Sequence, residues 1–211
     1  QRETEYNLQK IKNTVVKYEA TFGKQMNNEI KGTWWWENQK EALEAEIYID
    51  RKKVNKFKVV FANSVGKSFY EGDQAKNIPP SGSILPTAPP EFTYCFPPKL
   101  FLEIFGENLI NVINNGTAQL LGQEKIAGHN CFVLSGKVGE WREYKIWIDY
   151  NRDYRPLKIE LFYKGKNESF SSLIQNIQLE KINNIWMPVY GEIDSKDPDI
   201  VPVKVRVKEI K

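Results

Sequence analysis

The chain has 211 residues, of which 30 are basic and 27 are acidic, and its formal net charge is +3 at neutral pH. This length allows one large domain or two small ones, and no linker in the sequence demands two. The charges are spread along the chain rather than gathered in a basic patch, and no segment has about 18 consecutive apolar residues, so the sequence indicates neither a nucleic-acid-binding surface nor a membrane-spanning helix.

The first half of the chain alternates apolar with polar residues, which is the period of strands with one dry and one wet face. Residues 4–12 come first and predict a short helix. The apolar positions that share a face in the following segments are Val16, Tyr18, Ala20 and Phe22; Ile30, Gly32, Trp34 and Trp36; Leu43, Ala45, Ile47 and Ile49; and Phe57, Val59 and Phe61. We predict about five strands in this half.

The middle of the chain interrupts the alternation. Residues 77–98 contain prolines 79, 80, 86, 89, 90, 97 and 98, and proline removes a ladder donor, so we predict a long, semi-stiff loop here. A helix over residues 99–113 follows, begun by Pro97-Pro98 and ended at Asn114-Asn115-Gly116. Phe101 and Phe105 belong to its apolar surface, which is broad enough to predict burial, and Gly106 predicts a kink or a break into two short helices.

The last third of the chain predicts about six further strands after Cys131. Its turns, such as Asn151-Arg152-Asp153 and Asn183-Asn184, are too short for crossover helices, so the strands are antiparallel. About eleven twisted antiparallel strands do not stay flat, and we predict an incomplete barrel, or half-barrel, with the central helix as a plug on its concave face. The fold class is α+β, mostly antiparallel β, in a single domain over residues 1–211.

The sequence gives little support for catalysis. The single histidine, His129, stands two residues before Cys131, but no orienting partner or oxyanion element accompanies this pair. One histidine and two cysteines are too few for a zinc site without added carboxylates, and no phosphate-binding loop or other cofactor motif is present. We therefore predict no enzyme activity, no metal and no cofactor. Cys95 and Cys131 either form a disulfide or are two buried thiols, and the sequence leaves both open.

Tryptophans raise a second question, because Trp34-Trp35-Trp36 places two rings on one face of a strand and one on the other. One interpretation is that Trp34 and Trp36 are core residues; the other is that a set of rings lines a ligand cavity. Trp35, Trp147 and Trp186 lie opposite the aliphatic face of their strands in this pattern, where they could bind a protein partner.

Several segments, each a weak motif alone, together resemble the LolA/LolB-like and RseB-like superfamily of periplasmic lipoprotein carriers. They occur in the expected order and are Phe69-Tyr70-Glu71-Gly72-Asp73, the segment from Gly122 to Cys131, Lys145-Ile146-Trp147-Ile148-Asp149, Arg155-Pro156-Leu157-Lys158-Ile159 and Ile185-Trp186-Met187-Pro188. The resemblance implies a half-barrel of about eleven strands around helices inserted in mid-chain. It also implies a periplasmic protein, its signal peptide removed, that is not an enzyme and shields or senses acyl chains.

The leading hypothesis from the sequence is a monomeric envelope protein that binds a lipid, or the acyl chain of a lipoprotein, between sheet and helices. The candidate lining residues are Trp34, Trp36, Ile47, Phe57, Phe61, Phe101, Phe105, Ile146 and Ile159. The alternative is a sensor or adaptor domain that binds a membrane or envelope protein through the convex sheet face or an edge strand, with no lipid ligand.

Overall fold

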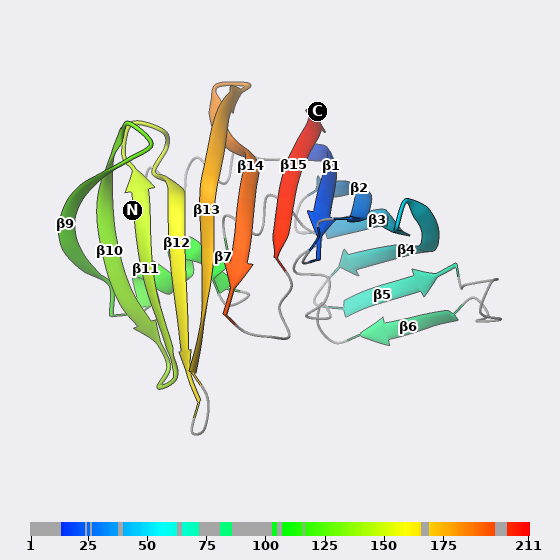
Figure 1. The fold of residues 1–211 in the computed structure, drawn as a ribbon, viewed down its shortest axis with the longest axis horizontal. Helices are drawn as coiled ribbons and strands as arrows, with labels where there is room; N and C mark the ends of the chain where they lie inside the picture. The colour runs from blue at the N-terminus through cyan, green and yellow to red at the C-terminus, as the bar shows by residue number, and fades with distance from the viewer. Residues whose placement is uncertain are drawn as a thin grey trace. The chain divides into compact units, whose positions relative to one another are not determined.

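Figure 1 shows the fold of the chain in a computed structural model. The structure describes residues 14–23, 25, 27–37, 40–62, 65–71, 81–85, 103–104, 107–115, 117–165, 169–196 and 202–211. These residues belong to two compact units. Unit 1 takes its described residues from 103 to 204, and unit 2 takes them from 14 to 85 together with Val205–Lys211.

Unit 2 is built from one antiparallel meander and one strand from the far end of the sequence. Its strands are β1 (Thr14–Phe22), β2 (Asn28–Glu37), β3 (Lys40–Ile49), β4 (Lys52–Ala62), β5 (Val65–Tyr70), β6 (Ser81–Leu85) and most of β15 (Val203–Ile210). They follow the hydrogen-bonded order β6-β5-β4-β3-β2-β1-β15. Two backbone hydrogen bonds between Val15 and Lys211, both 2.9 Å, tie β1 to the end of β15.

One face of the unit 2 sheet carries the core of this unit. The buried cluster consists of Val16, Tyr18, Trp34, Leu43, Ala45, Phe57 and Val59, with Ile30, Ile47, Val207 and Ile210 packed against it. The register explains the cluster, because Trp34 lies opposite Val16 on one side and Leu43 on the other, so side chains from neighbouring strands form continuous rows.

A cross-strand pair of tyrosine and glycine completes this core. Tyr18 lies opposite Gly32, and a β-carbon built on Gly32 would stand 2.4 Å from Cζ of the Tyr18 ring. Gly32 therefore leaves the space that the ring occupies, which is the physical reason for a glycine in the middle of a strand.

Unit 1 is a second antiparallel meander. Its strands are β9 (Gln119–Ile126), β10 (His129–Val138), β11 (Arg142–Asp149), β12 (Arg155–Lys164), β13 (Ser169–Ile182) and β14 (Ile185–Ser195), in the order β14-β13-β12-β11-β10-β9. A separate hairpin, β7 (Glu103–Ile104) and β8 (Glu107–Asn108), leads into the helix α4 (Leu109–Asn115). The first two residues of β15, Val203 and Lys204, belong to this unit.

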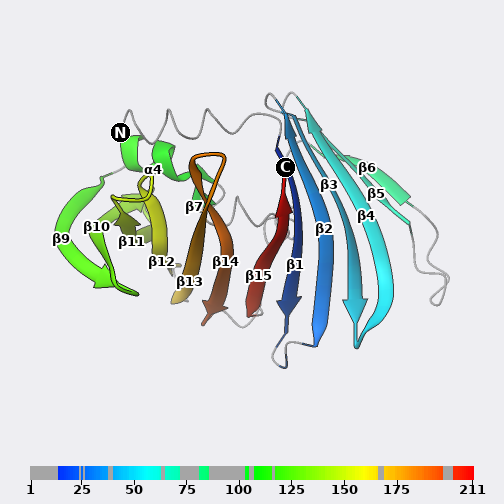
Figure 2. The same cartoon turned by 90° about the horizontal axis from the view of Figure 1, so that it is seen from above.

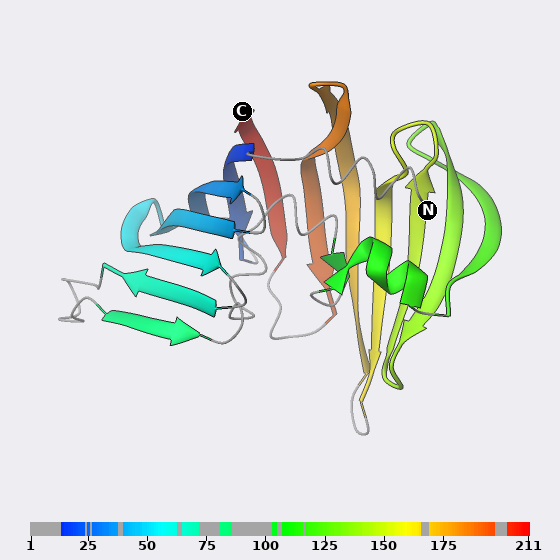
Figure 3. The ribbon, with the colours of Figure 1, turned by 180° about the vertical axis from the view of Figure 1, so that it is seen from behind.

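The core of unit 1 is aliphatic. Ile146, Ile159, Ile174 and Ile193 stand opposite one another on four successive strands and are all at most 5% exposed. A tyrosine and glycine pair recurs here, because Tyr144 lies opposite Gly136 and its hydroxyl would be 2.4 Å from a β-carbon on that glycine. Figures 2 and 3 show α4 lying over one face of β11 and β12, and its Leu109, Ile110 and Val112 are buried.

Among the described residues, three hairpins have two-residue turns in which both central residues have positive φ, as type I′ turns require. They are Asp50-Arg51 between β3 and β4, Ala127-Gly128 between β9 and β10, and Asn183-Asn184 between β13 and β14. Such turns match the right-handed twist of the flanking strands and fix the register of each hairpin. The predicted turn at Asn183-Asn184 is confirmed.

The prediction of a mostly antiparallel β fold is confirmed, but two strands were missed. The order contains thirteen strands instead of about eleven, and the additional ones are β6 and β9. The predicted loop over residues 77–98 is wrong at residues 81–85, which form β6. This strand lies at the edge of the sheet, where the missing N–H groups of the flanking prolines remove no hydrogen bond between central strands.

The central helix begins later than predicted. Residues 103–104 and 107–108 form the β7–β8 hairpin, so the helix over 99–113 is wrong there, and α4 extends only from Leu109 to Asn115. The predicted break at Gly106 falls between the two short strands. The helix over 4–12 lies outside the described residues. The single domain, the half-barrel curvature and the helical plug stay predictions.

Candidate functional site

The predicted lining residues divide between the two units. Trp34 and Phe57 belong to the core face of unit 2, at 1% and 2% exposure, and Ile47 packs against the same cluster. Ile146 and Ile159 are fully buried cross-strand partners in unit 1. Trp36 and Phe61 lie in β2 and β4, but their side chains are outside the described set, as are Phe101 and Phe105 entirely.

The apolar face of unit 2 brings together three of the predicted lining residues, Trp34, Ile47 and Phe57. The residues of its buried cluster are at most 2% exposed, so this face is a closed core in the structure, and a ligand binds there only if the core opens. Its cluster contains the large rings of Tyr18, Trp34 and Phe57, which are separated by small or branched residues such as Ala45. Rigid aromatic side chains next to small ones are typical of surfaces that bind apolar ligands. The described residues of unit 2 are all strands and turns, so they provide no helix over this face.

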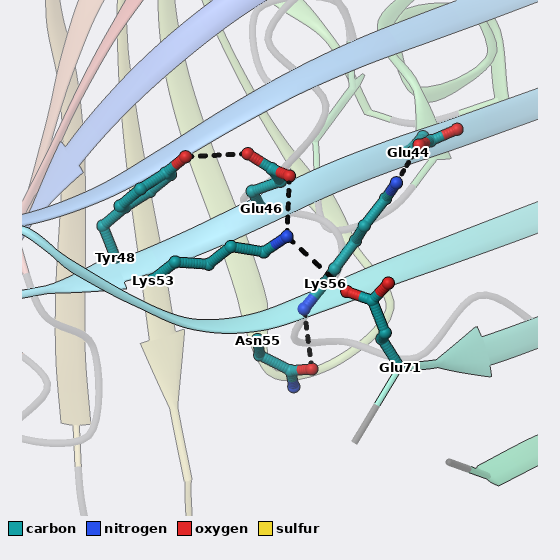
Figure 4. Close-up of polar contacts among 7 residues, drawn as sticks. All are labelled: Glu44, Glu46, Tyr48, Lys53, Asn55, Lys56 and Glu71. Carbon is teal, nitrogen blue, oxygen red and sulfur yellow. Dashed lines mark hydrogen bonds and ion pairs between the residues drawn. The ribbon is translucent and has the colours of Figure 1, made fainter. Parts of the chain in front are cut away.

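The opposite face of unit 2 carries a lattice of paired charges, part of which Figure 4 shows. Lys56 bonds Glu44 at 2.7 Å, and Lys53 lies 2.9 Å from Glu46 and 3.5 Å from Glu71. Tyr48 donates its hydroxyl hydrogen to Glu46 at 2.7 Å. Hydrogen bonds from these lysines and from Tyr48 lower the pKa values of Glu44 and Glu46. These groups satisfy one another and indicate a solvated surface.

The same pattern continues between β1 and β15. Lys208 bonds Glu19 at 2.7 Å, and Lys17 bonds Glu209 at 2.7 Å. The hydrogen bond from Lys17, followed by that from Lys211, lowers the pKa of Glu209 to about 2. These ion pairs connect β1, near the start of the sequence, with β15, near its end.

Two surface hollows lie in unit 2, and neither contains a predicted lining residue. One, of about 380 Å³, lies over β1, β2 and β3 and is lined mainly by charged residues such as Lys17, Glu19 and Lys31. The other, of about 500 Å³, lies at the turns beside Asn27 and Asp50, which hydrogen-bond each other. Most of the residues that line them are charged or polar, so they do not fit an acyl chain.

A polar cluster lies at one end of the unit 1 strands. The carboxylate of Asp149 is 1% exposed, and its Oδ2 lies 3.7 Å from Nδ1 of His129 and 3.6 Å from Nε of Arg152. Its Oδ1 accepts a hydrogen bond from the backbone of Asn151 at 2.9 Å. Arg155 donates from Nε to the carbonyl of Trp186 at 2.8 Å. The cluster ties the β11–β12 turn to β14, which is a structural role.

This cluster also contains the thiol of Cys131. It is free and buried, and burial together with the charge of Asp149 raises its pKa to about 11. A thiol with so high a pKa is a poor nucleophile at neutral pH. The thiol donates a weak hydrogen bond to the backbone carbonyl oxygen of His129, at an Sγ–O distance of 3.7 Å, and not to the imidazole of that residue. Cys95 lies outside the described residues.

The tryptophans of the alternative hypothesis occupy different settings. Trp147 is 2% exposed, because the ammonium groups of Lys145 and Lys158 lie 4.5 and 4.2 Å from its ring centroid and its indole donates to Glu124 at 2.7 Å. Trp186 is half-buried beneath Arg152. Trp35 lies opposite Val15 and Ala42, on the face of unit 2 away from Trp34. The predicted opposite facing of Trp34 and Trp35 is therefore confirmed.

No family model matches the chain, and no curated protein matches it by sequence. Solved structures do match. A domain assigned to outer membrane lipoprotein sorting from Vibrio parahaemolyticus aligns with 100% of this chain and 90% of its own, at 10% identity and a TM-score of 0.59. A LolA superfamily protein from Nitrosomonas europaea aligns with 100% and 92%, at 9% identity and a TM-score of 0.57.

A third structure, a DUF1329 family protein from Desulfovibrio piger, aligns with 100% of this chain and 90% of its own, at 12% identity and a TM-score of 0.54. Similarity at this level of identity shows the fold. The chain has the same fold as these proteins, so the resemblance inferred from its sequence is confirmed at the level of the fold.

Sequence reasoning did not find the polar cluster around Asp149 or the two tyrosine and glycine pairs. Asp149 ends a predicted strand and was weighed only as one of many acidic residues. The glycine signal was available, because Gly32 and Gly136 stand inside alternating segments, where glycine marks a close approach of another group. Only the register shows that the approaching group is a tyrosine ring in both units.

Proposed function

We propose that the protein is a non-enzymatic carrier or sensor that binds a lipid, or the acyl chain of a lipoprotein, against the apolar face of unit 2. The observation that supports this proposal is the aromatic cluster of Tyr18, Trp34 and Phe57 on one face of the unit 2 sheet. These rings are at most 2% exposed, so in this proposal the core opens and the acyl chain replaces part of its present contacts. The fold supports it too, since similar structures include a lipoprotein-sorting domain.

The energetics allow such a ligand, because the gain from burial falls within the range of the cost of association. Burial of a 16-carbon chain releases on the order of 10 kcal/mol at about 0.8 kcal/mol per methylene, against association costs of about 4–15 kcal/mol. We also propose that the protein acts in the bacterial envelope and is a monomer; the similarity of its fold to an outer membrane lipoprotein-sorting domain supports the first of these. Within the described residues, no helix has both the length and the apolar character needed to cross a membrane.

Two measurements test this proposal. Native mass spectrometry of the purified protein should show bound acyl species, and a fluorescent fatty acid should bind and be displaced by palmitate. Phe57→Leu should weaken this binding several-fold, because it removes a ring from the unit 2 cluster, whereas Ile159→Leu in the unit 1 core should leave it unchanged. Absence of acyl species and of probe binding, or equal loss in both variants, would contradict the proposal.

A further inference from the structure

The two strands at the ends of the order are protected very differently. Within the part of the chain that the structure describes, β6 and β9 each have one neighbour, so each has a free edge of backbone N–H and C=O groups. Strand β9 carries Glu124 and Lys125 and has a bulge opposite Val133 and Leu134. Charges and bulges of this kind prevent another strand from pairing with an edge.

Strand β6 lacks these features. Its sequence, Ser81-Gly82-Ser83-Ile84-Leu85, contains no charge and no proline, and its ladder with β5 runs without a register shift. An edge of this type is a template for an added strand. Proline precedes it at position 80 and follows it at position 86, which limits such pairing to about five residues.

Apolar side chains are exposed beside this edge, on the face of unit 2 that otherwise carries paired charges. Ile84 is 73% exposed, Phe69 is 51% exposed and Val60 is 39% exposed. The register places them together, because Lys67 lies between Val60 and Ile84 in one row, and Phe69 lies between Lys58 and Gly82 in the next. We call Val60, Phe69 and Ile84 the edge patch.

Two lysines, Lys58 and Lys67, flank the edge patch. Lys58 lies opposite Glu44 in the β3–β4 register and helps to lower the pKa of that carboxylate. Lys67, next to the edge strand, forms no ion pair with any residue that the structure describes, in contrast with Lys53 and Lys56 further along the same face. The complementary partner therefore carries negative charge.

We propose that β6 is the docking edge for an extended acidic and apolar segment of a partner protein, which adds to the unit 2 sheet as a further strand. The residue of that segment opposite Gly82 is bulky and apolar, because Gly82 has no side chain and the half-exposed ring of Phe69 lies directly beyond it. The residue two positions away, opposite Ile84, is acidic. Its carboxylate reaches the ammonium group of Lys67 on β5. The added strand and β5 are about 10 Å apart, a distance that a glutamate and a lysine side chain can span together.

This site is separate from the acyl-binding function proposed above. It uses the opposite face of the sheet and a free edge, and it takes a peptide rather than a lipid. The two functions can therefore fail independently, since loss of peptide binding leaves fatty acid binding unchanged.

The test is a titration of the full isotopically labelled chain with short blocked peptides, followed by amide NMR. The peptides Thr-Glu-Thr-Phe-Thr and Thr-Phe-Thr-Glu-Thr cover both strand directions. We expect one of them to shift the amide resonances of residues 81–85, and the corresponding peptide with lysine in place of glutamate to bind about tenfold more weakly. Shifts confined to other strands, or equal binding of the glutamate and lysine peptides, would overturn the proposal.

Substitutions at exposed positions separate docking from stability. Ile84→Lys should weaken binding of the glutamate peptide about tenfold, while Leu120→Lys on the protected edge β9, where Leu120 is 62% exposed, should leave it unchanged. Lys67→Glu should reverse the preference, so that the lysine peptide binds better. Sedimentation at the same concentrations identifies self-pairing, and a dimer that Ile84→Lys dissociates would overturn the assignment of β6 to a peptide partner.

Discussion

The two units solve one packing problem with different side chains. Both sheets place a tyrosine ring over a glycine of the neighbouring strand, Tyr18 over Gly32 in unit 2 and Tyr144 over Gly136 in unit 1. Beyond that pair, the unit 1 core is a row of isoleucines, with a helix over one face of its sheet, whereas the unit 2 core is aromatic. In the function that we propose, unit 2 is the unit that binds and unit 1 is the scaffold, and the difference between the two cores makes this division testable.

The largest expected effect is in the aromatic core. Trp34→Ala should lower the free energy of unfolding by about 3–5 kcal/mol, because it removes a fully buried ring, and Ile159→Val in unit 1 should cost only about 0.5–1.5 kcal/mol. Urea unfolding measures both. Hydrogen exchange should speed up in β2 and β3 for the tryptophan variant and in β11 and β12 for the isoleucine variant. Equal acceleration of both units by Trp34→Ala would break the comparison.

An intermediate effect is expected at the glycines under the tyrosine rings. Gly32→Ala and Gly136→Ala each place a β-carbon 2.4 Å from a tyrosine side-chain atom, so each should destabilise its unit by about 1–3 kcal/mol. Thermal unfolding measures the loss. Gly122→Ala is not a matched control, since Gly122 has a positive φ of 144°.

The matched control is the double variant in each unit. Tyr18→Leu should recover part of the loss from Gly32→Ala, and Tyr144→Leu should do the same for Gly136→Ala, because the smaller side chain frees the space. Strictly additive losses in either unit would show that the ring does not determine the glycine there.

The smallest expected effect is the acid dependence of the exposed ion pairs. Glu209 has its pKa lowered from 4.5 to about 2 in the folded chain by Lys17 and Lys211. A carboxylate with a depressed pKa stabilises the fold above its unfolded value and loses that contribution as pH falls from about 4.5 towards 2. Thermal melts at a series of acidic pH values should show a shallower decline for Glu209→Gln, and an unchanged slope would contradict this assignment.

Alternation of residue types was enough to predict most strands and their facing. Val16, Trp34, Leu43 and Phe57 were assigned to one face, and that face is the buried one in unit 2. The same rule worked for Ile146 and Ile159 in unit 1. It succeeded because the period of a strand depends only on the backbone, and each of these strands has one wet face.

The edge strands and the short hairpin could not be predicted in this way. Strand β6 is only five residues long and stands between prolines. The many prolines of this region predicted a loop, and five residues are too few for an alternating pattern to stand out. Residues 103–108 are apolar enough for a helix, yet they form two two-residue strands. The polar cluster at Asp149 depends on bringing together β10, β11 and β14, and such tertiary proximity leaves no local signal.

Strand β15 has a consequence for how the molecule folds. Its residues are divided between the two units. Its C-terminal part pairs with β1, through contacts of Lys208, Glu209 and Lys211. About 190 residues separate the two strands in the sequence, so this pairing closes a very long loop. Unit 2 therefore acquires its last ladder only after all of unit 1 has been synthesised. Until then the side of β1 that pairs with β15 is an unpaired edge in the nascent chain, where other strands can mispair.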